Sequence, residues 1–215
     1  MLDRTYQVVC NGRMEKPHAD LTREKILSSA FCEIHRKGFQ AASLADILEA
    51  TGLTKGALYY HFPTKQALGL AVVDEVVRTR LEERIFAPVR GAQRPLDRLV
   101  EVIEGIARES DAQGVALGCP LNNLMQEMSP LDEAFKERLS AILETWREVV
   151  RSALARAQAR GEARDDFDCG AAALFIVAAF EGCIGVAKNM QSVEAFRSCM
   201  RQLANFVVTL KADRS

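Results

Sequence analysis

The sequence predicts an all-α protein with an N-terminal three-helix domain that contains a helix-turn-helix and a larger C-terminal helical domain, about nine helices in total. Three observations lead to this prediction. Apolar residues recur at helical spacing along most of the chain, strand-like alternation is nowhere sustained, and residues 43–62 read as two short helices around a glycine turn. With 215 residues, 48% of them hydrophobic, the chain can bury a sizeable core.

The helix-turn-helix is predicted from residues that begin and end helices. Ser43 can cap a first helix, and Gly52 breaks it at a position where a positive φ is easily adopted. Thr54 can cap a second, very short helix, in which Leu58 and Phe62 lie four residues apart and face inward. This pattern is typical of a DNA-reading unit.

The outward face of the second short helix has the chemistry of a DNA contact. A lysine stands near the helix N-terminus, small residues allow close approach to a major groove, and aromatic rings with polar tips can reach phosphate oxygens. The alternative is a short surface helix with exposed tyrosines. The residues expected to contact DNA are Ser43, Thr54, Lys55, Gly56, Ala57, Tyr59, Tyr60, His61 and Lys65.

The remaining elements are predicted from apolar residues at helical spacing and from residues that cap helices. Residues 1–19 show no periodicity and are expected to form a flexible arm, and a first helix is expected from Thr22 to Lys37. Thr64 caps a helix that should end near residue 86, before Pro88. With the domain boundary near residue 70, the DNA-binding domain covers 20–70 and the sensing and dimerisation domain covers 71–215.

Five more helices, with one loose stretch among them, complete the expected order. Pro95 opens one helix, residues 111–118 read as a loose stretch, and a short helix spans about 120–128. A long helix is expected to start at Ser129 and Pro130 and to end at Gly161. The segment 167–190 is apolar nearly all round, which predicts burial against more than one neighbour, and a last helix follows residue 192.

The helix-turn-helix also carries a family resemblance. Residues 51–62 (TGLTKGALYYHF) and 65–68 (KQAL) resemble the N-terminal domain of the tetracycline-repressor (TetR) family, and residues upstream match that family's first two helices at the same spacings. The resemblance covers about residues 20–70. It implies a homodimeric repressor that binds a palindromic operator in double-stranded DNA and is released by a small-molecule inducer.

Other classes of protein find less support. The net charge is −1, no apolar run approaches the length of a membrane span, and the six cysteines are scattered, so we expect a reduced, cytoplasmic protein. Cys32 and His35 have a metal-ligand spacing but lack further ligands, and packing is the favoured role. Enzyme motifs are absent, so neither catalysis nor a cofactor is expected; a small helical enzyme or ligand carrier with an incidental helix-turn-helix is the alternative.

A ligand cavity and a dimer interface are expected in the C-terminal domain. Gly182 and Gly185 allow close helix approach, which suits a subunit contact and equally suits packing within the chain; the resemblance favours the dimer. Residues expected to line the cavity are Phe86, Asn122, Met125, Gln126, Trp146, Phe175 and Phe180, any of which could instead belong to the core.

Cys119 is a candidate sensor of electrophiles or oxidants. Its place before a helix N-terminus would favour the thiolate and lower the pKa of the thiol. The resemblance extends to TetR-like members that carry a Gly-Cys here and respond to reactive species, with a late lysine, here Lys188, as a cationic neighbour. The alternative is a small apolar filler at a helix start.

Overall fold

The structure, a computed structural model, describes residues 18–212, and this part of the chain is helical with no strand apart from an isolated bridge between Ala163 and Lys211. The prediction of an all-α chain is confirmed. The helices are α2 (His18–Lys37), α3 (Leu44–Thr51), α4 (Lys55–His61), α5 (Lys65–Ala71), η2 (Val72–Val77), α6 (Arg78–Leu81), η3 (Glu82–Phe86), α7 (Ala87–Arg90), α8 (Pro95–Glu109), α9 (Ala112–Leu117), α10 (Pro120–Met128), α11 (Glu133–Ala159), α12 (Cys169–Met190) and α13 (Val193–Thr209).

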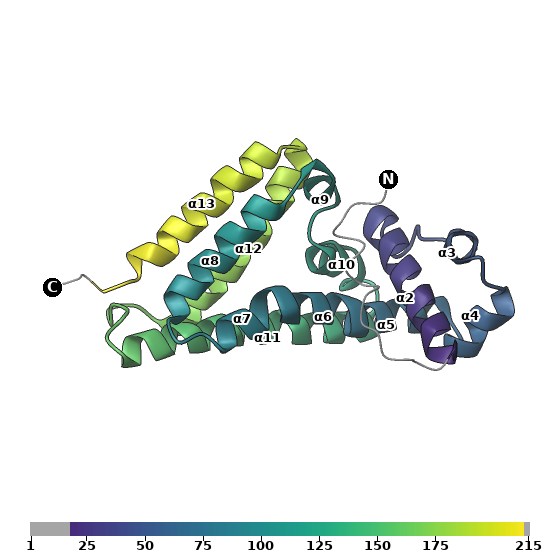
Figure 1. Ribbon diagram of the computed structural model, residues 1–215, viewed down its shortest axis with the longest axis horizontal. Coiled ribbons are helices and arrows are strands. Elements are labelled where there is room, and N and C mark those ends of the chain that lie inside the picture. Colours follow the sequence, from purple (N-terminus) through teal and green to yellow (C-terminus); the bar gives the residue numbers. More distant parts are fainter. Residues whose placement is uncertain (1–17, 213–215) are drawn as a thin grey trace.

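Three regions are arranged along the long axis of the molecule (Figure 1). Helices α2, α3 and α4 form a small domain at one end, and the run from α5 to α7 leaves it and lies alongside α11. Helices α8, α12 and α13 pack together on the far side, and the short helices α9 and α10 lie between this bundle and the small domain.

The small domain is organised by local caps. The Ser43 hydroxyl accepts the N–H of Ala45, and Gly52 ends α3 in the left-handed region at φ 65°. Helix α2 begins at His18, four residues before the predicted start, so the last two residues of the expected arm 1–19 are helical. Residues 1–17 of that arm lie outside the described part of the chain.

The helix that leaves the small domain continues through Pro88, contrary to the prediction that it ends near residue 86. Its bonding widens to the i→i+5 pattern in η2 and again in η3, which ends immediately before α7. Pro88 then stands in the first turn of α7, where its missing N–H costs little. The wider turn ahead of the proline is the physical reason that the helix is not broken.

Two further boundaries differ from the predictions. The stretch 111–118 is not loose, because Asp111 caps the six-residue helix α9 by accepting the N–H of Gly114. Helix α11 begins after Asp132, whose carboxylate accepts the N–H of Phe135, and not at Ser129 and Pro130. In both places an aspartate caps the start of the helix.

Helix α12 is buried on one side only. Its outward face carries a stripe of apolar side chains that are exposed in the single chain, with Leu174 58% and Val186 59% exposed. The prediction that this segment is buried against more than one neighbour is confirmed by its packing on α9, α11 and α13, while one face stays uncovered in the single chain. By length and composition alone, this 22-residue helix could cross a membrane, since an 18-residue window of it has a mean hydropathy of 2.0, so the expectation that no run approaches this length is wrong. Its other side packs against α11 and α13 as part of the helical domain.

A disulfide joins Cys183 of α12 to Cys199 of α13, with the Cα atoms 5.5 Å apart. This contradicts the expectation of a fully reduced protein. Helical packing brings together two cysteines that are 16 residues apart in sequence and show no recognisable motif. The bond fixes α13 against α12 beside the exposed stripe, while Cys32, Cys119 and Cys169 are free thiols.

We expect Cys199→Ser to lower the free energy of unfolding by about 3 kcal/mol, because the disulfide closes a loop of about 15 residues and restricts the unfolded chain. Urea denaturation without reductant measures the difference, and Cys32→Ser is the matched control. In denaturant, thiol titration should count two fewer thiols before reduction than after it. An equal count would contradict the bond.

Candidate nucleic-acid interface and ligand cleft

The short helix α4 presents a sharply divided surface. Thr54 caps it by accepting the N–H of Ala57, and Leu58 and Phe62 anchor it in the core at 0% and 3% exposure. On the opposite face the Tyr60 ring is 81% exposed and stacks edge-on against His61, with ring centroids 5.0 Å apart. The apolar anchors thus hold the aromatic face outward.

The other residues predicted to contact DNA surround this face. Lys55 is exposed and its ammonium lies 5.9 Å from the ring of Tyr59, which is 41% exposed. Gly56 is exposed and Ala57 is half-buried on the first turn. We name the surface formed by residues 54–61 the reading face. Its contact with DNA stays a prediction.

Two predicted DNA contacts have other partners within the chain. The Ser43 hydroxyl is used in the cap of α3. The Lys65 ammonium donates to the Gln40 carbonyl at 2.9 Å and lies 4.9 Å from the ring centre of Phe39. Lys65 therefore holds the turn after α2, and any phosphate contact would compete with that bond.

The turn after α2 is also held from the C-terminal domain. The Glu127 carboxylate accepts the backbone N–H groups of Phe39 and Gln40, each at 2.8 Å. Gly38 adopts φ 86°, and a Cβ there would lie 2.8 Å from a Glu127 oxygen, so only glycine gives the carboxylate this approach. We call these two bonds the Glu127 clamp.

A second contact joins the domains beside the clamp. His35 of α2 donates from Nε2 to the carbonyl oxygen of Gly118 at 2.8 Å, while its Nδ1 is buried without a partner. Burial, opposed in part by this bond, lowers the pKa of His35, with Arg80 and Lys188 adding repulsion. The ring is therefore neutral at pH 7, and Nδ1 is a bare acceptor.

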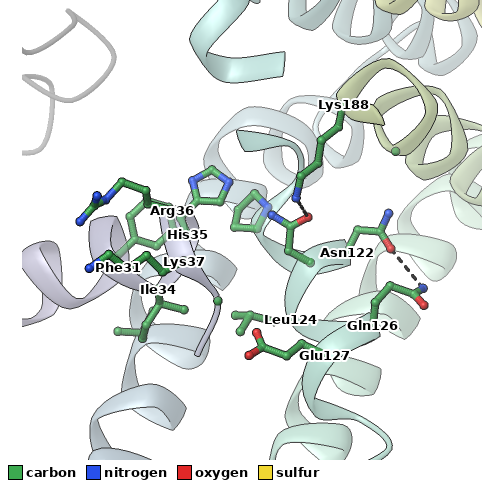
Figure 2. A pocket seen from close by; sticks show the side chains of 15 residues that line it. Phe31, Ile34, His35, Arg36, Lys37, Asn122, Leu124, Gln126, Glu127 and Lys188 are labelled. Atoms are coloured by element: carbon green, nitrogen blue, oxygen red, sulfur yellow. Dashed lines mark hydrogen bonds between the residues drawn. The ribbon is translucent and has the colours of Figure 1, made fainter. Parts of the chain in front are cut away.

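Between these contacts lies a cleft of ≈ 570 Å³, a volume usual for small-molecule sites. Its walls come from α2, η2, α10 and α12, so both domains contribute (Figure 2). Two predicted ligand residues, Asn122 and Gln126, line it. The residues that line this cleft are Phe31, Ile34, His35, Arg36, Lys37, Gly38, Val72, Pro120, Asn122, Asn123, Leu124, Gln126, Glu127, Gly185 and Lys188.

The other predicted ligand residues do not line the cleft. Phe86, Trp146 and Phe180 pack as a chain of rings in the core, with successive centroids 6.2 and 5.0 Å apart. Met125 is half-buried against the core. Phe175 is 53% exposed on the outer face of α12, so its expected place inside the domain is wrong.

Comparison with known proteins decides the family. The model for bacterial regulatory proteins of the tetR family matches residues 26–72, and the model for the tetracyclin repressor-like C-terminal domain matches residues 95–203. The transcriptional regulator AcuR of Cereibacter sphaeroides is 31% identical over 196 residues, which cover 90% of this chain and 88% of AcuR. The chain belongs to the TetR family.

Solved structures of TetR-family proteins share the fold. A TetR transcriptional regulator from Chloroflexus aurantiacus is 27% identical with a TM-score of 0.78, covering 90% of this chain and 97% of its own. Regulatory protein TetR from Rhodobacter sphaeroides is 29% identical with a TM-score of 0.75, covering 86% of this chain and 98% of its own. The chain is thus a transcriptional regulator with a helix-turn-helix DNA-binding domain.

Cys119 lacks the surroundings that would activate its thiol in this TetR-family chain. It is 7% exposed and donates to the Glu181 carboxylate at 3.2 Å. Burial and then the charge of Glu181 raise the pKa of the thiol well above 9.0, contrary to the expected lowering. The expected cationic neighbour, Lys188, donates instead to Asn123 at 2.8 Å. A sensing role for Cys119 stays a prediction, without the thiolate on which it was based.

Sequence analysis missed the residues that join the two domains. His35 drew attention only as a metal ligand, and no group of three or more His, Cys, Asp or Glu side chains within 18–212 could hold a metal. Glu127 had no signal, because its partners are 88 and 87 residues away in sequence. Gly118 precedes Cys119 and adopts a φ of 75°, a backbone conformation that a glycine before a helix start can suggest from the sequence alone.

Glu181 should make stability fall as pH rises. Burial raises its pKa to about 7 from 4.5, so between these values the folded chain holds a proton that the unfolded chain has lost. The free energy of unfolding should drop across this window by up to about 3 kcal/mol, then level off. Glu181→Gln should remove the drop, whereas Glu104→Gln, an exposed control on α8, should retain it. Urea melts at pH 5, 6, 7 and 8 measure the slope.

Proposed function

We propose that the protein is a ligand-responsive repressor in the cytoplasm that binds a palindromic operator as a homodimer and is released by a small molecule held in the interdomain cleft. The observation that carries this proposal is the direct connection between the cleft and the reading face. Glu127 lines the cleft and also clamps the turn after α2, which packs with α3 and α4. A ligand in the cleft is therefore placed to move the reading face.

The exposed chemistry of α4 supports binding to duplex DNA. Lys55 and the hydroxyls of Tyr59 and Tyr60 can contact phosphates at the walls of a major groove, while Gly56 and Ala57 add little bulk near the bases. Cationic and anionic residues nearly balance across the small domain, so affinity must come from placement rather than from overall charge. Two copies are needed, because one such helix reads only a few base pairs.

The outward face of α12 supports a dimer. Between residues 171 and 186 its exposed positions, 171, 174, 175, 178, 182 and 186, are all apolar or glycine, and Phe175 packs against Phe206 of α13 with ring centroids 4.8 Å apart. A continuous apolar face of this kind is unfavourable in water and is typical of a subunit contact. Gly182 lies in this stripe with no atom within 4 Å of a Cβ built on it, whereas Gly185 faces Asn122 of the same chain.

Release from DNA follows from a shift between two arrangements of the domains. A ligand that fits the cleft better when α2 has moved relative to α10 would favour that arrangement, and the spacing of the two reading faces in the dimer would no longer match successive grooves. We place the inducer in the cleft rather than at Cys119, because the buried thiol beside Glu181 is poorly suited to react. The alternative, an enzyme or carrier, would show no sequence preference for DNA.

Lys55→Ala and Tyr59→Ala should each weaken operator binding by roughly tenfold (about 1.4 kcal/mol). Both side chains are exposed, so neither change leaves a cavity. Loss of Lys55 should also reduce the slope of log K against log salt by about one, since one phosphate contact is lost. Fluorescence anisotropy with DNA from upstream of the gene measures both. Lys136→Ala, an exposed lysine on α11, is the charge-matched control; equal losses there would contradict the reading face.

Gly182→Arg should convert the dimer to monomers and abolish tight operator binding. The new side chain meets open space within its own chain, so the fold is retained while a charge enters the apolar stripe. Light scattering after size exclusion measures the mass. Leu131→Arg places the same residue at a 62% exposed leucine outside the stripe and should stay dimeric. A dimeric Gly182→Arg protein would move the interface elsewhere.

A further inference from the structure

We propose that the interdomain cleft recognises a small organic monocarboxylate, with the Lys188 ammonium as its counter-ion and the side-chain amides of Asn122 and Gln126 as its hydrogen-bond donors. This inference rests on the proposed function only in taking the cleft as the inducer site. It is carried by the charges, hydrogen bonds and apolar surfaces of the cleft itself.

Lys188 brings a positive charge to the cleft that no carboxylate balances within residues 18–212. Its half-buried ammonium donates to the neutral Asn123 oxygen at 2.8 Å. The two other cations of the lining already have carboxylate partners, because Arg36 pairs with Glu33 at 2.5 Å and Lys37 pairs with both Glu33 and Asp46 at 2.6 Å. A half-buried ammonium is costly without an anion nearby, so the cleft favours a negatively charged ligand at Lys188.

Glu127, the acidic residue of the lining, does not balance the charge of Lys188. Both oxygens of Glu127 accept backbone N–H groups in the clamp, and its carboxylate lies at the end of the cleft away from Lys188 (Figure 2). Lys188 lies over Gly118, where a Cβ would approach its Cδ to 2.8 Å. Glycine at this position therefore leaves the room in which the lysine stem extends toward Asn123.

Donors near the ammonium are weakly engaged. The Asn122 amide donates to the Glu181 carbonyl at 3.5 Å, and the Gln126 amide donates to Asn122 at 3.5 Å, both at the limit of a hydrogen bond. These N–H groups can turn to carboxylate oxygens at little cost. A carboxylate offers acceptors for the ammonium and the amides together, which a neutral ligand does not.

The remaining wall is apolar. Phe31, Ile34, Val72 and Leu124 line the cleft and are all buried. One unbalanced cation beside an apolar wall matches an anion with one charge and a hydrocarbon body. Phosphate carries more charge and no apolar part, so its second charge would be unpaired and the wall uncovered.

The same contacts connect the carboxylate to the small domain. Asn123 holds the Leu117 carbonyl through its amide at 2.8 Å, and the adjacent Gly118 carbonyl accepts from His35 of α2. A carboxylate that draws Lys188 from Asn123 therefore acts on the turn between α9 and α10 to which His35 is bonded. Occupancy of the site would thus change the contact between the two domains.

Calorimetric titration of the full-length protein with the straight-chain acids from propionate to octanoate tests the proposal. At least one acid should bind, at least tenfold more tightly than its neutral amide and than inorganic phosphate. Lys188→Met should weaken that acid by at least tenfold, Lys188→Arg should restore most of the affinity, and Lys136→Met should match wild type. If no acid binds better than its amide, if phosphate binds equally well, or if Lys188→Met matches wild type, the proposal is overturned.

A separate anisotropy measurement of operator release distinguishes the two proposals. Acid binding without any operator binding by the protein would overturn the repressor function and leave the cleft chemistry in place. Operator binding by a protein that binds none of the acids would overturn the cleft chemistry and leave the repressor function in place. Binding of each acid and its amide to the wild-type protein can be compared even if a Lys188 variant does not fold. The proposal can therefore be overturned without the variants.

Discussion

The arrangement of the two domains depends on two hydrogen bonds from the backbone of Phe39 and Gln40 to one carboxylate, that of Glu127. They fix a turn that has no regular structure of its own and that leads from α2 into α3. From the other side the same turn is held by Lys65, which donates to Gln40. A charged acceptor for two amides is stronger than a neutral one, so this short loop can be as well defined as a helix.

Most of the helices could be predicted from the sequence, because the residues that cap a helix lie next to it in the chain. Ser43, Thr54 and Thr64 were expected as caps, and each accepts a backbone N–H in the folded chain. Such local reasoning is wrong at Pro88, where the wider helical turn before the proline lets the helix continue. It is also wrong at 111–118, where an aspartate caps a helix too short to show periodicity. In both cases the competing effect is a small backbone adjustment that a hydrophobic pattern does not record.

The candidate sites were harder to predict than the helices. The reading face is contiguous in sequence, so caps and two buried anchors sufficed to orient it. The cleft joins α2 to α10 and α12, and its decisive pairs are 65 to 88 residues apart. Phe175 was expected inside because apolar character does not by itself tell a core position from an exposed one. Cys183 and Cys199 meet only because two helices pack side by side.

The small number of cations on the reading face has a consequence for how the protein would find its operator in a cell. Affinity for arbitrary DNA comes almost entirely from phosphate contacts, and here the chain carries a net charge of −1 while Lys65 is turned back to Gln40. Such a regulator would spend little time on the rest of the chromosome. A larger share of its copies would then remain free, so fewer copies would be needed to occupy an operator that is selected by shape and base contacts.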